Sequence, residues 1–250
     1  MGQFLSKRPK RSKCAQDNGA YLAKPSGKCC LEGTIHKGEA RGSWDVIAGV
    51  DTYISKPPEG KANGHVLLYF PDVWGMFPNG LLVMDAFADA GFLTLGLDYF
   101  RGVSLSLIAH LDVFFFFAEI LQDPVWKHRK DRHDTQNKDF DYEAWKKKHT
   151  AFADEAVPQW VKAVTERYKN SDETKFFCVG YCFGAPYVCN ELAGGTVTAG
   201  AFAHPAFLKE HHFQNIKSEW ILHEVSTEIC TNAEHCRAPV SVLLRGRPHV

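Results

Sequence analysis

Short apolar runs alternate with a helical pattern in the first half of the chain. His65–Phe70 is a continuous apolar run ended by proline, as expected of a strand buried on both faces. Apolar residues then recur with a helical period over residues 78–90, and Gly91 ends this pattern. Residues 92–99 repeat the buried-strand pattern. A strand, a helix and a strand this close together form a βαβ unit, so the sequence predicts a largely parallel sheet.

The second half of the chain continues this alternation of helices and strands. A helical pattern covers residues 144–169, and we expect Pro158 to kink this helix or divide it in two. Residues 175–181 form the next apolar run, which ends directly on Cys182. A helical pattern begins just after that cysteine, and residues 197–204 predict a further strand.

Two outlying segments also have strand patterns. Residues 44–55 alternate around Gly49 and predict short antiparallel strands. Residues 240–244 (Val-Ser-Val-Leu-Leu) predict a last strand. The pattern as a whole predicts one α/β domain over residues 29–250, a mostly parallel sheet with flanking helices.

The composition is that of an ordinary globular protein. The chain has 250 residues, of which 45% are hydrophobic and 23% charged. Lys+Arg and Asp+Glu balance at 29 each, so nothing in the charge favours nucleic acid as a partner. Eight cysteines in a chain of this length, without a secretory signal, predict reduced thiols and a cytoplasmic protein.

The N-terminus carries a possible membrane signal. Residues 1–28 are polar and basic and predict a disordered tail. Met1–Ser6 fits the pattern for myristoylation of Gly2, which would combine with a polybasic stretch into an anchor on anionic membrane surfaces. The alternative is a solubilising tail without lipid. The basic residues are Lys7, Arg8, Lys10, Arg11 and Lys13.

The strongest chemical signal is the G-x-C-x-G pattern of Gly180–Gly184 between a predicted strand and a predicted helix. Glycines at these positions permit a tight turn that holds a nucleophile on strained backbone above a sheet. The N-terminus of the helix that follows favours the thiolate of Cys182. The alternative is a buried structural cysteine in a glycine-rich turn.

Three separated motifs resemble one known family. Gly180–Ala185 resembles the nucleophile turn of the dienelactone hydrolase family. Phe70–Gly75 is similar to the turn after that family's first long buried strand, and Leu97–Gly102 resembles its D-x-x-x-R segment. The similarity runs from about Cys29 to Lys217. It implies an α/β-hydrolase-type fold and a small-molecule substrate.

The resemblance also implies roles for individual residues. Cys182 attacks an ester or lactone carbonyl and forms a thioester, without a metal or organic cofactor. The backbone N–H groups of Val73 and Phe183 form the oxyanion hole. Asp72 takes the place of the acid that contacts the resting thiol, and Arg101 is a candidate for binding a substrate carboxylate.

The base and its orienting acid have candidates only. Residues 226–230 are similar to the segment that carries the family's acid, and Glu228 is the candidate there, although Cys230 falls where the family has Asp. His249, after the predicted last strand, is a candidate base. His204, which closes a strand on the correct edge of the sheet, is a further candidate site residue.

Two segments depart from the family pattern. Residues 103–122 form an atypical apolar insertion, and residues 218–250 form a truncated or divergent C-terminus. Both are compatible with an error in the gene model. The sequence therefore leaves two alternatives to an active hydrolase: a family member that keeps the fold but cannot turn over, and a membrane-attached binding module.

Overall fold

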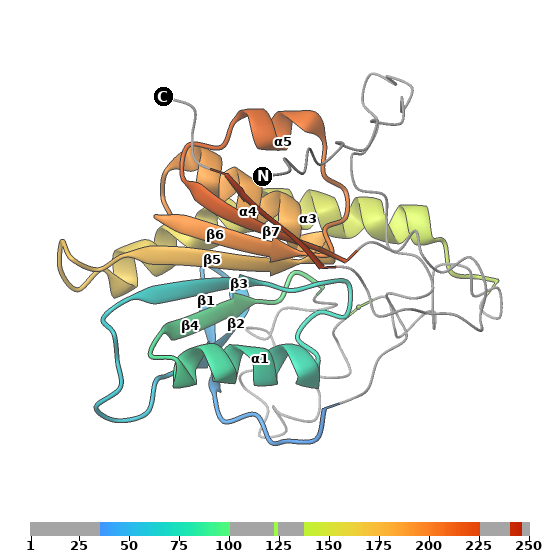
Figure 1. Ribbon diagram of the computed structural model, residues 1–250. Helices are drawn as coiled ribbons and strands as arrows, with labels where there is room; N and C mark the ends of the chain where they lie inside the picture. Colours follow the sequence, from blue (N-terminus) through green and yellow to red (C-terminus); the bar gives the residue numbers. More distant parts are fainter. Residues whose placement is uncertain (1–35, 101–122, 125–137, 226–240, 247–250) are drawn as a thin grey trace, which may run out of the picture.

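The computed structural model describes residues 36–100, 123–124, 138–225 and 241–246, with side chains as far as Ser218. The strands of these residues form one eight-stranded sheet in the order β1-β2-β4-β3-β5-β6-β7-β8 (Figure 1). The strands are Ser43–Ile47 (β1), Val50–Ser55 (β2), Val66–Phe70 (β3), Leu93–Leu97 (β4), Phe176–Tyr181 (β5), Ala199–Ala203 (β6), Glu219–Val225 (β7) and Ser241–Gly246 (β8).

The centre of the sheet is parallel, as the sequence predicted. β4, β3, β5, β6 and β7 pair in parallel, whereas β1 with β2, β2 with β4 and β7 with β8 pair antiparallel. The predicted βαβ unit is β3, α1 and β4. The predicted antiparallel pair is the β1–β2 hairpin, whose strands are joined by the turn Ala48–Gly49.

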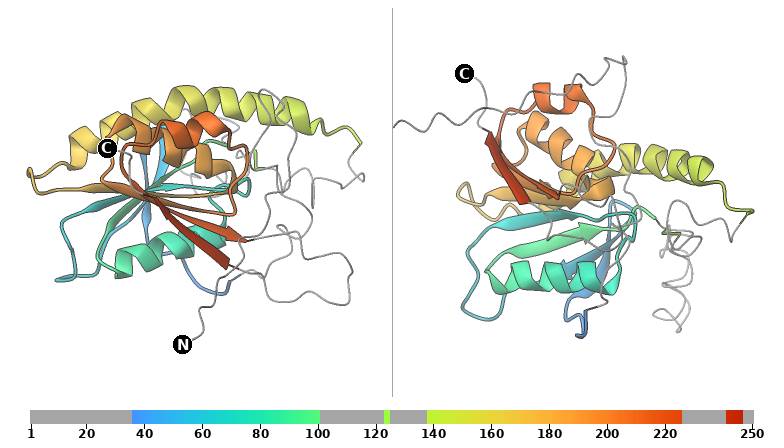
Figure 2. Two further views of the ribbon diagram at one scale, coloured as in Figure 1. Left: turned by 45° about the horizontal axis from the view of Figure 1, so that its top comes forward. Right: turned by 45° about the vertical axis from the view of Figure 1, so that its right-hand side comes forward.

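Helices cover both faces of the sheet. α1 lies on one face, whereas α3 and α4 lie on the other with the short α5 beside α4 (Figures 1 and 2). Side chains alternate along β3, so Leu67 and Tyr69 pack toward α1 while Leu68 and Phe70 pack in the larger core beneath α3 and α4. The helices are Pro78–Asp89 (α1), Tyr142–Tyr168 (α3), Ala185–Gly194 (α4) and Glu210–Gln214 (α5).

α3 is a single continuous helix, so of the two predicted effects of Pro158, a division of the helix is wrong and a kink stays a prediction. Pro158 is exposed, and its ring lies on the solvent side of the helix. The carbonyl that loses its intrahelical partner there can bond to water instead. Val157, Trp160 and Val161 are buried against the sheet on both sides of the proline and hold the two halves in line.

The C-terminal strands extend the sheet beyond β6. β8 confirms the predicted strand at residues 240–244, whereas β7 has no counterpart among the predicted elements. β8 runs antiparallel to β7, with Gly246 paired to Trp220 and Ser241 to Val225. β8 therefore ends at the edge of the sheet where the parallel strands begin.

Among the described residues, no helix has the length and apolar character needed to cross a membrane.

Candidate active site

The carboxyl ends of β3, β4, β5 and β6 lie at one edge of the sheet because these strands are parallel. The chain passes from β3 outward to β4, and later from β5 outward to β6 on the other side of β3. The direction of winding thus reverses between β3 and β5, and ligands of open α/β sheets bind at this kind of position. The turn after β3 and Cys182 after β5 both lie there.

Cys182 occupies a strained turn between β5 and α4. Its φ is 48°, in the left-handed region that non-glycine residues rarely adopt, and it opens a short 3₁₀ turn that leads into α4. The residue is buried, and its carbonyl oxygen accepts a hydrogen bond from the N–H of Ala206 at 3.0 Å. The strand, strained cysteine and helix follow one another as the sequence predicted.

The two glycines of this turn are required by close approach of backbone. A Cβ on Gly184 would lie 2.2 Å from the carbonyl oxygen of Phe70 at the end of β3, and a Cβ on Gly180 would lie 2.8 Å from the carbonyl oxygen of Gly184. Any larger residue would force the turn away from β3. The glycines therefore fix Cys182 against the strand that leads to Val73.

Val73 lies in the turn after β3, and the last residue of that strand, Phe70, contacts the cysteine turn at Gly184. The N–H of Gly75 donates to the carbonyl of Asp72 at 2.9 Å, which closes the turn, and Val73 itself is buried. On the other side, Phe183 lies in the first turn of a helical segment, where backbone N–H groups have no acceptor within the helix. Val73 and Phe183 thus belong to the turns that follow two adjacent strands, β3 and β5.

Asp72 is a half-buried acid at this edge. Its Oδ1 accepts a hydrogen bond from the N–H of Trp74 at 2.8 Å. Removal from water raises the pKa of Asp72 from 3.8 to about 7, and the hydrogen bond from Trp74 opposes that rise only in part. Near neutral pH this carboxyl is therefore present in both protonation states and can hold or release a proton.

Tyr99 is a buried tyrosine at the carboxyl end of β4. Burial raises the pKa of its hydroxyl well above the usual value, and the charges of Tyr187, Tyr69, Asp72 and Cys182 add to the effect. Tyr99 donates its hydroxyl hydrogen to the carbonyl of Pro71. Tyr99 was not among the site residues predicted from the sequence. Its position two residues after the end of the parallel strand β4 is a signal that could have indicated it.

His204 lies on the opposite side of Cys182 from Asp72. Tyr181 pairs with Ala203, so the residues that follow, Cys182 and His204, stand next to each other at the ends of β5 and β6. His204 is half-buried with a φ of 36°, and its ring lies 5.8 Å from the ring of Tyr181. The predicted position of His204 at the edge of the sheet that carries Cys182 is confirmed.

Several predicted residues lie outside the described part of the chain. These are Gly2, Arg101, Glu228 and His249, and their roles stay predictions. The strand that precedes His249 does end at the edge of the sheet opposite Cys182, because β8 runs antiparallel to β7.

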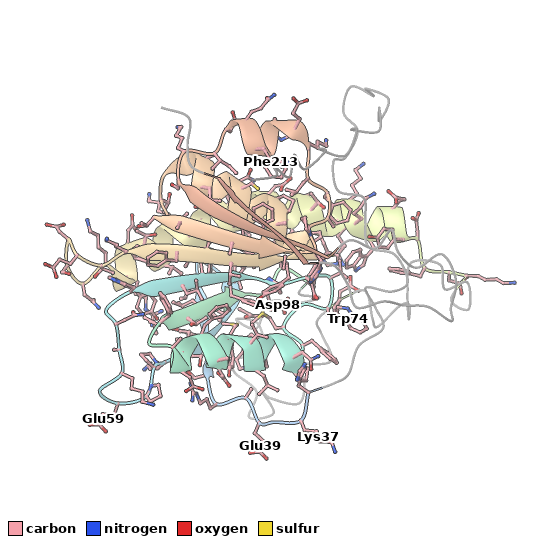
Figure 3. The ribbon with its side chains drawn as sticks, viewed as in Figure 1. Lys37, Glu39, Glu59, Trp74, Asp98 and Phe213 are labelled. Carbon is pink, nitrogen blue, oxygen red and sulfur yellow. The ribbon has the colours of Figure 1, made fainter. Side chains whose placement is uncertain are left out.

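An Asp–His pair near this edge serves another purpose. His149 Nε2 lies 2.9 Å from Asp123 Oδ2, and its Nδ1 lies 3.2 Å from the carbonyl oxygen of Tyr99. Both ring nitrogens of the buried His149 are therefore engaged, and the pair ties α3 to the segment after β4. Asp98, at the start of that segment, is labelled in Figure 3. Among the residues with described side chains, no three His, Cys, Asp or Glu groups could share a metal ion.

Comparison with known proteins gives consistent matches. Residues 50–226 match the sequence model of the dienelactone hydrolase family. Two fungal proteins from Gibberella moniliformis are similar: Dienlactone hydrolase 1 at 42% identity over 82% of this chain, and Dienlactone hydrolase 2 at 45% over 69%. This chain spans 70% and 64% of their lengths, respectively. A Thermus thermophilus protein of solved structure aligns at 15% identity with a TM-score of 0.43, over 71% of this chain and 66% of that one.

Proposed function

Because this chain belongs to the dienelactone hydrolase family, we propose that it hydrolyses carboxylic esters or lactones through Cys182. The observation that carries the proposal is the position of this residue. It stands on strained backbone at the carboxyl end of a central parallel strand, held there by two glycines that accept no larger side chain. Left-handed backbone at a non-glycine residue costs roughly 1–3 kcal/mol and persists where function requires it.

The reaction would proceed in two stages. The sulfur of Cys182 forms a bond to the carbonyl carbon, and the carbonyl π electrons move onto oxygen, where the N–H groups of Val73 and Phe183 donate to the negative charge. As this intermediate collapses, the carbon–oxygen bond to the leaving group breaks and the released alkoxide takes a proton. Water then attacks the thioester, which releases the acid and restores the thiol. One oxyanion donor typically contributes roughly 10²–10³ in rate.

Two groups are available to carry the protons. Asp72, whose pKa is about 7, can accept the thiol proton on one side of Cys182. His204 directly follows β6, the neighbour of β5, and the pairing of Tyr181 with Ala203 supports it as the group that passes a proton to the leaving group. His249 is the competing candidate for this second role.

Hydrolysis of 4-nitrophenyl acetate and of dihydrocoumarin, an activated ester and a lactone, tests the proposal. Cys182→Ala should reduce both rates to the background level. Cys189→Ala is the matched control, because it removes another buried thiol from the adjoining helix, and its rates should stay within a few-fold of the wild type. Equal rates for the wild type and Cys182→Ala would refute the role of Cys182 and favour a family member that keeps the fold without turnover.

A second pair of variants separates the two imidazoles. His204→Asn is suited to the site because asparagine tolerates a positive φ. It should reduce kcat by roughly 10²-fold or more, as expected of a lost acid–base group, whereas His249→Asn should leave kcat unchanged. The reverse result would assign the role to His249.

A further inference from the structure

A second cleft lies on the helical face of the molecule, outside the group formed by Cys182, Asp72 and Val73. It has a volume of about 500 Å³ and is lined by the first halves of α3 and α4 and by residues 207–212. Small-molecule sites commonly measure about 300–1,000 Å³, so the size suits a single small ligand. Phe183 is the one residue that the cleft shares with the candidate active site.

The apolar part of the cleft consists of aromatic rings. Phe183 and Tyr187 line it from the start of α4, and Phe207 lies across from them. The rings of Phe183 and Phe207 meet edge to face, with their centroids 5.9 Å apart. Phe207 has a φ of 60°, a strained conformation for an aromatic residue, which places its ring at the wall of the cleft. These walls suit a flat apolar group.

The polar part of the cleft carries an excess of positive charge. Lys146 and Lys147 line it from α3 and Lys209 lines it from the facing segment, and Asp154 is the single carboxylate among the lining residues that the structure describes. Asp154 accepts a hydrogen bond from the hydroxyl of Tyr187 at 3.1 Å. No ion pair joins Lys147 to another residue in the described part of the chain.

Lys146 is already partly neutralised within the cleft. Its ammonium pairs with Glu143, and it also lies 6.0 Å from the centre of the Phe207 ring. Its side chain is only 20% exposed. Lys146 would therefore contribute little to the binding of a ligand anion.

His212 adds a neutral hydrogen-bond donor. Burial, assisted by His211 and Lys209, lowers the pKa of His212 to about 4, so its ring is uncharged at neutral pH. Its Nδ1 accepts the N–H of Lys209 at 2.8 Å, and the ring proton is therefore on Nε2. An N–H of this kind can donate to a carboxylate.

We propose that this cleft binds a small aromatic carboxylate, with its ring against Phe183, Phe207 and Tyr187 and its carboxylate between Lys147 and Lys209. The aromatic side chains of the cleft are the reason to expect an aromatic ring in the ligand. The lysines of the cleft are the reason to expect a negative charge on the ligand. The site is separate from Cys182 and does not depend on the proposed hydrolysis.

Isothermal titration with three probes tests the site on the full chain. Benzoate should give saturable binding, whereas benzamide, which keeps the ring without the charge, and acetate, which keeps the charge without the ring, should each bind at least tenfold more weakly. Lys147→Gln and Lys209→Gln should each weaken benzoate binding by roughly five- to tenfold, the effect of losing one exposed charged partner. Lys162→Gln is the control, since Lys162 is an exposed lysine of α3 outside the cleft.

Three results would overturn the proposal. The first is the absence of saturable benzoate binding. The second is equal affinity of the wild type, Lys147→Gln and Lys209→Gln for benzoate. The third is loss of binding after alkylation of Cys182 with iodoacetamide, which would place benzoate at the cysteine instead of in the cleft.

Discussion

Gly184→Ala offers a direct test of how the cysteine turn is built. The added Cβ would lie 2.2 Å from the carbonyl oxygen of Phe70, whereas an ordinary carbon–oxygen contact is about 3.3 Å. The turn and the end of β3 must therefore move apart by about 1 Å. Neither side of this contact is a flexible side chain that could rotate away, so we expect a loss of about 3 kcal/mol in the free energy of unfolding, at the upper end for overpacking.

The same displacement should affect catalysis. Phe183 precedes Gly184, and Val73 follows Phe70 by three residues, so the two proposed oxyanion donors move apart with the two backbones. A 1 Å misplacement costs roughly 10²-fold in rate, or about 2.7 kcal/mol of transition-state stabilisation. We therefore expect kcat/KM for 4-nitrophenyl acetate to fall by about 10²-fold.

The measurements are urea unfolding and steady-state hydrolysis, with Gly194→Ala as the matched control. Gly194 lies at the end of α4, and the nearest atom to its added Cβ would be Thr196 Oγ1 at 3.7 Å. Alanine there should leave activity unchanged and alter the free energy of unfolding by no more than about 1 kcal/mol, in the stabilising direction. Wild-type stability and activity in Gly184→Ala would refute the argument from close approach.

Two further predictions concern acids whose pKa is raised by burial. Glu191, on α4, is 8% exposed, and burial raises its pKa from 4.5 to about 7. Because the folded protein holds this proton more tightly than the unfolded chain, stability falls as pH rises from about 4.5 to 7. The raised pKa of Glu191 corresponds to a loss of at most about 3 kcal/mol in the free energy of unfolding. Glu191→Gln should therefore raise the free energy of unfolding by about 2 kcal/mol at pH 8 and leave it unchanged at pH 4, with the exposed Glu155→Gln as control; an equal effect at both pH values would contradict this. For Asp72, with its pKa of about 7, the pH dependence of kcat/KM should show an inflection near pH 7 that Asp72→Asn removes, and an unchanged profile would exclude its role.

The parallel core of the fold could be predicted from the sequence because its strands are short apolar runs bounded by turn residues. β3, β4, β5 and β6 all follow this pattern. β7 escaped prediction because only Trp220, Ile221 and Leu222 are consecutive apolar residues, and polar residues flank them. Its place between β6 and β8 depends on pairing with distant strands, which local pattern does not encode.

The candidate site was only partly predictable for a related reason. The glycines around Cys182 mark the turn locally, since close approach of backbone leaves a trace in the sequence. The gathering of Asp72, Tyr99 and Cys182 at one edge of the sheet instead depends on β3 lying between β4 and β5. The cleft beside α4 likewise combines residues from α3, α4 and the segment after β6, which no sequence spacing brings together.

Trapping of the acyl-enzyme tests the central proposal most directly. The protein would be mixed with 4-nitrophenyl acetate, quenched with acid and digested, and the acetylated peptide would be identified by mass spectrometry. The proposal predicts one acetyl group on Cys182, labile to hydroxylamine as a thioester is, and none at this position in Cys182→Ala. Acetylation at another residue, or the same modification pattern in Cys182→Ala, would contradict it.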